Sequence, residues 1–395
     1  MLEVRKEARS PPMADPFAFR LSLLYGAFFA YTGLSMPFMP AWLAAKGLDA
    51  REIGIVLAAP MVVRIVAVPL STRLADRVAG LRPALVAAAV ASVAGFALVG
   101  LAARFVPILA TYTLAAVALA PVLPLADAYA LRGLRDRGRS YGSVRLWGSV
   151  AFIMANLGGG VLLARLGAVN VIWAVTAALV LSALAASALA PLAPEAAEPA
   201  PRRTKVSLWR SPAFAAVVLG ASLIQASHAV IYGFGTLQWS ARGIGGTSIG
   251  MLWALGVVAE IVLFALSSRV VGALGATGMI VLGGAGGALR WAVMAFDPPT
   301  AALPLLQALH GLSFGATHLG AMHVLARAAP AGRGATTQGD FVAVQGVVFA
   351  AVMSGSGVLV EAYGSLAYGA MAAVAAAGGM LAGVALGWQR RASAA

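Results

Sequence analysis

Long apolar runs alternate with short polar or charged segments along almost the whole chain. An α-helix needs roughly 20 residues to cross the hydrocarbon core of a bilayer, and each run is long enough to do so. Because a backbone surrounded by lipid must satisfy its own hydrogen bonds, each run predicts a membrane-spanning helix. The twelve runs cover residues 17–44, 51–72, 83–103, 105–131, 141–165, 168–191, 212–240, 247–268, 276–296, 301–326, 340–361 and 364–388.

The composition excludes an ordinary soluble enzyme. Of the 395 residues, 61% are hydrophobic and 11% are charged, whereas soluble domains carry about 25% charged residues. The chain has no cysteine, which excludes disulfides, cysteine zinc sites and thiol catalysis. The net charge of +14 is spread over short clusters between the apolar runs, a pattern typical of the positive-inside rule. We therefore expect the lipid bilayer, and no nucleic acid, as the partner of the basic segments.

The basic residues predict the orientation of the chain in the membrane. With both termini placed in the cytoplasm, 20 of the 28 Lys and Arg residues lie in cytoplasmic segments and five lie in outer segments. The remaining three, Arg64, Arg145 and Arg290, lie within predicted helices. Because cytoplasmic loops are the basic ones in membrane proteins, this bias predicts cytoplasmic N- and C-termini in a bacterial-type cytoplasmic (inner) membrane.

The longest polar stretch, from Pro191 to Pro212, divides the predicted helices into six and six. A central loop between two equal sets of helices suggests a duplicated transporter. The expected fold is an all-α membrane protein with two pseudo-symmetric six-helix bundles, and we expect a monomer. No small-residue cleavage site follows a short apolar core near the N-terminus, so no signal peptide is expected. The expected divisions are a cytoplasmic arm at 1–16, bundles at 17–191 and 212–389, a cytoplasmic central loop at 192–211 and a cytoplasmic tail at 390–395.

Ionisable side chains inside a span are costly and usually mark a transport pathway. Asp127 lies five residues before Arg132, and Arg145 lies six residues after Arg139, at the facing ends of two consecutive predicted helices. At 1.5 Å rise per residue, both lie roughly 8–9 Å from their helix ends, so we expect a facing pair at equal depth. Such a pair would either fix helix packing or orient a substrate, with Arg145 as a bidentate donor.

A second set of ionisable residues is predicted within the spans of the C-terminal half. Glu260 lies roughly 13 Å from its helix end, near the midplane. Arg290 and His310 reach a similar depth from either side of a tight turn at 297–300. A carboxyl group in a low-dielectric medium favours its neutral form, whereas a nearby arginine favours the charged form. The three residues are therefore candidates for proton coupling, unless Glu260 and Arg290 form a static pair.

Other polar residues refine this picture. The spacing of His318 and His323, five residues apart, differs from the i, i+4 pair of a zinc-binding helix, so no metal site is expected. Arg64 lies near the middle of its span, and deep arginines therefore outnumber deep acids by three to two. This excess favours an anionic substrate such as a monocarboxylate. A polar stripe at helical spacing favours a cavity-lining face and consists of Gln307, His310, Ser313 and Thr317.

Four N-terminal segments carry a family resemblance. They are Pro37–Leu43 (P-F-M-P-A-W-L), Leu74–Arg82, Pro124–Ala128 and Tyr141–Gly148. They resemble the major facilitator superfamily, and within it the lactose permease and phenylpropionate permease groups. Leu74–Arg82 is similar to the cytoplasmic gating motif of the superfamily, which implies that role for Asp76 and Arg77. The other resemblance implies substrate binding by Asp127, Arg145 and Phe152, the last in the place of a sugar-stacking tryptophan.

The C-terminal half carries the same resemblance. Leu306–His310 is similar to the helix that bears the substrate- and proton-linked histidine of lactose permease, and Arg290 has the spacing of its coupling arginine. Ser313 replaces the family's carboxylate one turn later, so Glu260 is the candidate proton carrier. Segments closest to the phenylpropionate permease group contain Trp147 and His228. Together with Arg64, these two residues complete the expected substrate-binding set.

The expected function is import of a small organic solute, driven by a proton gradient and without another cofactor. An aromatic monocarboxylate such as a phenylpropionate is the expected substrate, with an oligosaccharide–proton symporter and proton-driven drug efflux as alternatives. A membrane-embedded hydrolase would need a Ser/His or paired-Asp constellation, and a sensor would need an appended soluble domain; neither is expected here, and the chain is not predicted to be an enzyme. The run Gly283–Gly287 lies within a span, where small residues permit close helix packing, so ATP-driven transport is not favoured.

Overall fold

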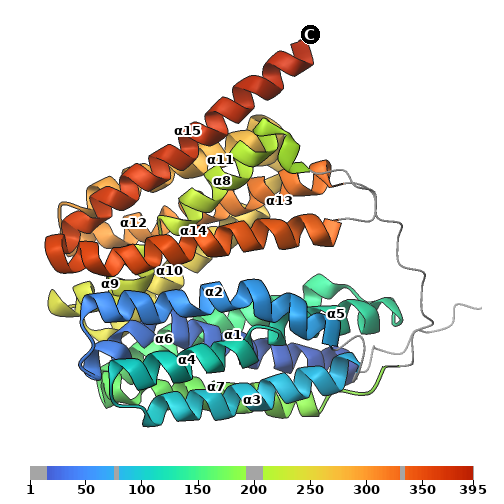
Figure 1. Ribbon diagram of the computed structural model, residues 1–395, viewed down its shortest axis with the longest axis vertical. Coiled ribbons are helices and arrows are strands. Elements are labelled where there is room, and N and C mark those ends of the chain that lie inside the picture. Colours follow the sequence, from blue (N-terminus) through green and yellow to red (C-terminus); the bar gives the residue numbers. More distant parts are fainter. Residues whose placement is uncertain (1–15, 75–79, 193–207, 330–333, 395) are drawn as a thin grey trace, which may run out of the picture.

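The computed structural model describes residues 16–74, 80–192, 208–329 and 334–394, and every regular element in that part of the chain is helical (Figure 1). The all-α prediction is therefore confirmed. The N-terminal helices are α1 (Pro16–Ala45), α2 (Ala50–Leu74), α3 (Leu81–Leu101), α4 (Phe105–Leu119), α5 (Val122–Arg135), α6 (Tyr141–Leu166) and α7 (Val171–Ser187). The C-terminal helices are α8 (Pro212–Ala226), α9 (Ala229–Ala241), α10 (Gly246–Ala265), α11 (Ser267–Met294), α12 (Leu303–Ala308), the π-helix η5 (Gly311–Ala316), α13 (Thr317–Ala328), α14 (Gly334–Tyr363) and α15 (Ala367–Ala394).

The observed helices follow the predicted apolar runs closely. Nine stretches of the described chain are long and apolar enough to cross a membrane, and one of them, at 337–391, covers both α14 and α15. Some predicted spans are interrupted. One is divided between α4 and α5 at Pro121, whose ring removes a backbone donor. Another is divided into α12, η5 and α13, so the predicted run at 301–326 is not one continuous α-helix.

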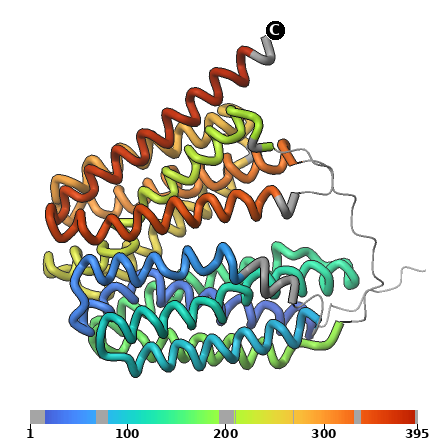
Figure 2. Tube along the Cα trace, viewed as in Figure 1, coloured from blue at the N-terminus to red at the C-terminus, as the bar shows by residue number. Residues whose placement is uncertain are grey.

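The helices form two groups that lie one above the other in Figure 1. Helices α1 to α7 make the lower group and α8 to α15 the upper one, and Figure 2 shows the same arrangement along the Cα trace. We call the end where α1 begins and α15 ends the terminal end, and the end with the turns at 46–49 and 242–245 the far end. The ribbons of the two groups approach each other at the far end and diverge toward the terminal end.

The buried apolar residues form clusters that are partly shared between the two groups of helices and partly confined to one group. One apolar cluster combines residues of both halves, including Phe38 and Trp42 with Trp239, Trp253 and Met353. Two further clusters each belong to a single half, one within residues 17–192 and the other within 208–385. The halves therefore share a core only in part, and each keeps a core of its own elsewhere.

The helices of the two halves meet closely at glycines. Helix α6 crosses α10 at Gly160, where an added Cβ would collide with the carbonyl oxygen of Gly246. Helix α2 crosses α14 in a similar way at Gly54, where a Cβ would lie 2.9 Å from the carbonyl oxygen of Met353. Absence of a side chain lets two helix backbones come together in this way.

Two polar contacts also join the halves. The hydroxyl of Thr236 on α9 donates to the carbonyl oxygen of Pro37 on α1 at 2.6 Å. Arg51, at the start of α2, forms a 2.7 Å ion pair with Glu361, near the end of α14. Both contacts lie toward the far end, so the halves are held together there by packing, a buried hydrogen bond and an exposed ion pair.

Candidate functional site

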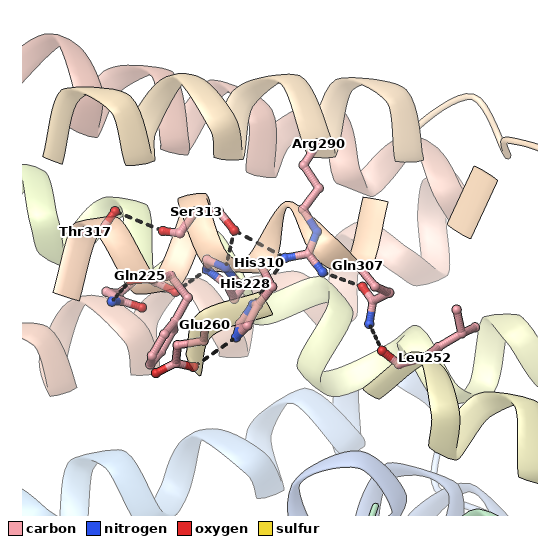
Figure 3. Close-up of polar contacts among 10 residues, drawn as sticks. Gln225, His228, Leu252, Glu260, Arg290, Gln307, His310, Ser313 and Thr317 are labelled. Atoms are coloured by element: carbon pink, nitrogen blue, oxygen red, sulfur yellow. Dashed lines mark hydrogen bonds and ion pairs between the residues drawn. The ribbon is translucent and has the colours of Figure 1, made fainter. Parts of the chain in front are cut away.

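A polar cluster lies inside the C-terminal half, where residues from several helices converge (Figure 3). Glu260 comes from α10, Arg290 from α11, Gln307 from α12, Ser313 from η5, and His310 from the two-residue link before η5. Gln225 and His228 reach the cluster from the junction of α8 and α9, and Thr317 from the start of α13. The predicted grouping of Glu260, Arg290 and His310 is thus seen in the structure.

Arg290 is the buried cation of the cluster, with 2% of its surface exposed. Its Nη1 donates to Nδ1 of His310 and to Oγ of Ser313, each at 3.3 Å, and its Nη2 donates to Oε1 of Gln307. The guanidinium also lies 4.4 Å from the ring centre of Trp291, a favourable position for a cation. All of these partners are neutral groups or a π face, and Nε of Arg290 has no hydrogen-bond partner among the described residues.

The structure records no ion pair between Arg290 and Glu260, both of which lie in the described chain. The static pair considered from the sequence is therefore not what this structure contains. A buried charge without an opposite charge is expensive. Arg290 is held by neutral acceptors, and no carboxylate pairs with it among the described residues.

His310 connects Arg290 with Glu260. An arginine can only donate, so Nδ1 of His310 must accept the hydrogen bond from Nη1. This assigns the proton to Nε2 in a neutral ring, and Nε2 lies 3.9 Å from Oε2 of Glu260. Glu260 is the member nearest the N-terminal half in Figure 3, and 20% of its side chain is exposed. His310 therefore lies between the partly exposed carboxylate and the buried guanidinium.

His228 is connected to Arg290 through the hydroxyl of Ser313. Its Nδ1 faces the carbonyl oxygens of Ile224 and Gln225, each at 3.2 Å, and must therefore donate. Its Nε2 then accepts from the hydroxyl of Ser313, at 3.1 Å, while that oxygen accepts from Arg290. His228 is fully buried. Its observed contacts are with the cluster, and its expected contact with a substrate stays a prediction.

The π-helix η5 explains how these groups come together. π-helical turns are rare and occur frequently at functional sites, and this one contains Ser313. Its first residue, Gly311, packs so closely on α10 that a Cβ would lie 2.9 Å from the carbonyl oxygen of Ala259. The side chain of Gln225 donates to the carbonyl oxygen of Phe314, at 3.4 Å. The polar stripe was predicted from α-helical spacing, which gives no signal for the wider turn.

The predicted site residues of the N-terminal half are arranged differently. Oδ1 of Asp127 accepts hydrogen bonds from the hydroxyls of Tyr25, at 2.6 Å, and Tyr141, at 2.8 Å. The guanidinium of Arg145 lies 3.8 Å from the ring centre of Phe29 and 5.6 Å from that of Tyr25. No ion pair joins Asp127 and Arg145, both of which lie in the described chain. The expected ion pair is replaced by contacts with aromatic residues of α1 and, for Asp127, also with Tyr141 of α6.

The aromatic partners of Asp127 and Arg145 were not predicted, although the sequence contains a pattern that indicates two of them. Tyr25 and Phe29 are four residues apart on α1, and residues at this spacing share one face of a helix. An aromatic face on the first helix, opposite a predicted acid and arginine, would have indicated both residues. Tyr141 begins the helix that carries Arg145, so its closeness to Asp127 follows from the short turn between α5 and α6.

The remaining predicted residues lie apart from both groups. Arg64 is an exposed residue of α2 close to Tyr31. Phe152 is half-buried, and its carbonyl oxygen accepts a 2.8 Å hydrogen bond from the side chain of Asn156. Trp147 is 56% exposed. Asp76 and Arg77, the predicted gating residues, lie outside the described residues.

Comparisons with known proteins agree with this architecture. Residues 18–375 match the model of the MFS_1 like family. The chain is 31% identical to the Probable 3-phenylpropionic acid transporter of Escherichia coli (strain K12), over 88% of this chain and 90% of that protein. It is 29% identical to the Maltose permease of Geobacillus stearothermophilus, over 77% of each chain.

Solved structures show the same fold at low sequence identity. The nucleoside transporter NupG superimposes with a TM-score of 0.77 at 16% identity, covering 94% of this chain and 98% of NupG. A bacterial homologue of the human lysosomal transporter Spinster, in an inward-facing and occupied conformation, gives a TM-score of 0.70 at 16% identity over 96% and 98% of the two chains. The chain therefore belongs to the MFS_1 like family and is a multi-pass membrane protein of the secondary-transporter class within the major facilitator superfamily.

Proposed function

We propose that this chain is a proton-coupled symporter that imports a small aromatic monocarboxylate by alternating access. The observation that carries the proposal is the connection from the partly exposed Glu260 through His310 to the buried Arg290, which has only neutral partners. We place the terminal end in the cytoplasm of a cell with a bacterial-type inner membrane, because the basic residues are concentrated in the segments at that end.

The charges suggest why proton and anion would bind together. When Glu260 is ionised, its negative charge partly offsets the positive charge of Arg290 and repels a nearby carboxylate. When Glu260 takes up a proton, the charge of Arg290 is no longer balanced, and an anion close to the cluster is attracted. At the low dielectric of a protein interior such interactions are several times stronger than in water. Protonation and substrate binding would thus favour each other.

The substrate class is supported by charge and by relatedness. Arg64, Arg145 and Arg290 outnumber the acids Asp127 and Glu260 within the spans, which favours an anion. One relative in the comparison is named for 3-phenylpropionic acid. We therefore propose a phenylpropionate-type substrate, in which a carboxylate and an aromatic ring occur together.

A carbohydrate is the second candidate. One oxygen of Asp127 is held by two tyrosines, and Phe29 offers a ring beside Arg145. An acid next to aromatic rings is also suited to sugar hydroxyls and sugar faces. The other relative is named for maltose. The two candidates differ in charge, so one experiment can separate them.

The test is uptake by the purified protein in proteoliposomes with an imposed inward proton gradient. We expect radiolabelled 3-phenylpropionate to accumulate, maltose and lactose not to compete, and a protonophore to abolish accumulation. Glu260→Gln should remove accumulation against a gradient while leaving exchange of labelled for unlabelled substrate. Competition by a sugar, or active accumulation that persists in Glu260→Gln, would overturn the proposal in its substrate or its coupling part respectively.

A further inference from the structure

The side chain of Tyr232 on α9 lies beside the polar cluster without taking part in its hydrogen bonds. Its ring centre lies 5.5 Å from that of His228 and 6.5 Å from that of His310. Arg290 and Glu260 are the charged groups that act on its hydroxyl electrostatically. No role for this tyrosine follows from its place in the sequence, and none of the steps proposed above uses it.

The ring of Tyr232 is fixed by its neighbours. It is stacked on Phe349 of α14, with ring centres 6.2 Å apart and planes inclined by 27°, and Trp253 of α10 lies 6.0 Å away. Aromatic contacts at these separations are attractive and restrict the ring. The hydroxyl is therefore held at a defined position, which reduces the entropy lost when it binds a partner.

The hydroxyl itself has no partner within the described chain, and Tyr232 differs in this from several other tyrosines. Tyr25 and Tyr141 donate to Asp127, Tyr129 donates to a backbone carbonyl, and Tyr368 donates to Gln238. The hydroxyl oxygen of Tyr232 is also not among the buried unpaired polar atoms. The oxygen is thus not completely buried, and Tyr232 as a whole is half-buried.

The accessible side of Tyr232 is an interior one. Tyr232 is itself half-buried, and its neighbours along α9, Val230, Ile231, Gly233 and Phe234, are buried. The next residue, Gly233, lies close to Met353 of α14 and to Leu57 of α2 in the other half. The ring of Tyr232 therefore lies among side chains of α10, α14 and the polar cluster, close to the boundary with the other half, where a transported solute would pass.

We propose that the hydroxyl of Tyr232 donates a hydrogen bond to the carboxylate of the bound substrate. A phenol donates well to an ionised acceptor, and the field of Arg290 favours negative charge at this place. The inference rests on the proposed transport of an aromatic carboxylate and identifies a residue that selects the acid over neutral analogues. Tyr232 would then be a substrate-binding residue beside the proton-coupling group.

The experiment measures binding of 3-phenylpropionate and of its neutral analogue 3-phenylpropionamide to the purified protein by isothermal titration calorimetry. Since a hydrogen bond to a charged group is strong, Tyr232→Phe should weaken acid binding by about tenfold or more. Amide binding should change by less than about twofold, which also shows that the variant is folded. The matched control is Tyr368→Phe, whose hydroxyl already has Gln238 as its partner, and which should bind the acid like the wild type.

The outcomes separate this inference from the function on which it rests. If the wild type binds no aromatic acid, the proposed substrate and the role of Tyr232 both fall. If the wild type binds the acid and Tyr232→Phe binds it equally well, only the role of Tyr232 is overturned. An equal loss in Tyr368→Phe, or an equal loss for acid and amide, would likewise contradict a specific hydrogen bond to the carboxylate.

Discussion

The two halves of the molecule hold their charged side chains through different kinds of contact. In the C-terminal half, Arg290 is buried and each of its Nη atoms is engaged by acceptors of fixed geometry. In the N-terminal half, Arg145 lies on the face of Phe29, and the acid predicted to be its partner, Asp127, is held by two tyrosines instead. The difference indicates that the C-terminal half depends on exact hydrogen bonding, whereas the N-terminal half depends on charge beside aromatic surface.

The largest effect is expected from Arg290→Lys. A lysine keeps the charge but cannot reproduce the planar fork that reaches Gln307, His310 and Ser313 together. Buried acceptors would lose their donors, and each such loss costs about 1–3 kcal/mol. We expect uptake of the substrate in proteoliposomes to fall by about a hundredfold or more. Uptake within threefold of the wild type would show that charge alone suffices in this half as well.

A smaller effect is expected from Arg145→Lys in the other half. The ammonium group can also lie over the ring of Phe29, although a stacked guanidinium is only partly replaced by it. Because no hydrogen bond of Arg145 to a side chain is found among the described residues, initial uptake rates should fall by about tenfold at most. Arg145→Ala, which removes the charge, should abolish uptake. Equal losses in the two lysine variants would remove the distinction between the halves.

The smallest effect is expected from Tyr25→Phe. Asp127 keeps its hydrogen bond from Tyr141, and its carboxylate can recruit water where the hydroxyl was lost. The melting temperature in detergent should fall by only a few degrees, consistent with about 1 kcal/mol for one hydrogen bond. The double variant Tyr25→Phe/Tyr141→Phe tests this redundancy. If Tyr25→Phe alone is as unstable as the double variant, the two tyrosines do not share the role.

The sequence predicted the helices well because the apolar runs alone determine where a chain can cross lipid. It also predicted that Glu260, Arg290 and His310 come together, since depth along each helix follows from the distance to the nearest turn. Depth says nothing about direction around the helix axis. For this reason the expected pairing of Asp127 with Arg145 was not found, and both residues turn to aromatic groups of α1 instead.

Two features of the C-terminal site could not be predicted from the spacing of polar and apolar residues. The π-helix at Gly311–Ala316 has the composition of an ordinary apolar helix, and its first residue packs closely against α10. The hydrogen-bond polarity that joins His228, Ser313 and Arg290 depends on which carbonyl oxygens lie near each ring nitrogen. Such information exists only after the helices are packed.

The apolar cluster shared between the halves has a thermodynamic consequence for the transport cycle. A transporter that works by alternating access must at some stage open the far end, and part of the cluster around Phe38, Trp42, Trp239 and Met353 would then meet water. Exposure of apolar surface raises the heat capacity. The balance between the two conformations should therefore vary with temperature along a curve, so that cooling and heating can both shift the resting population of the protein.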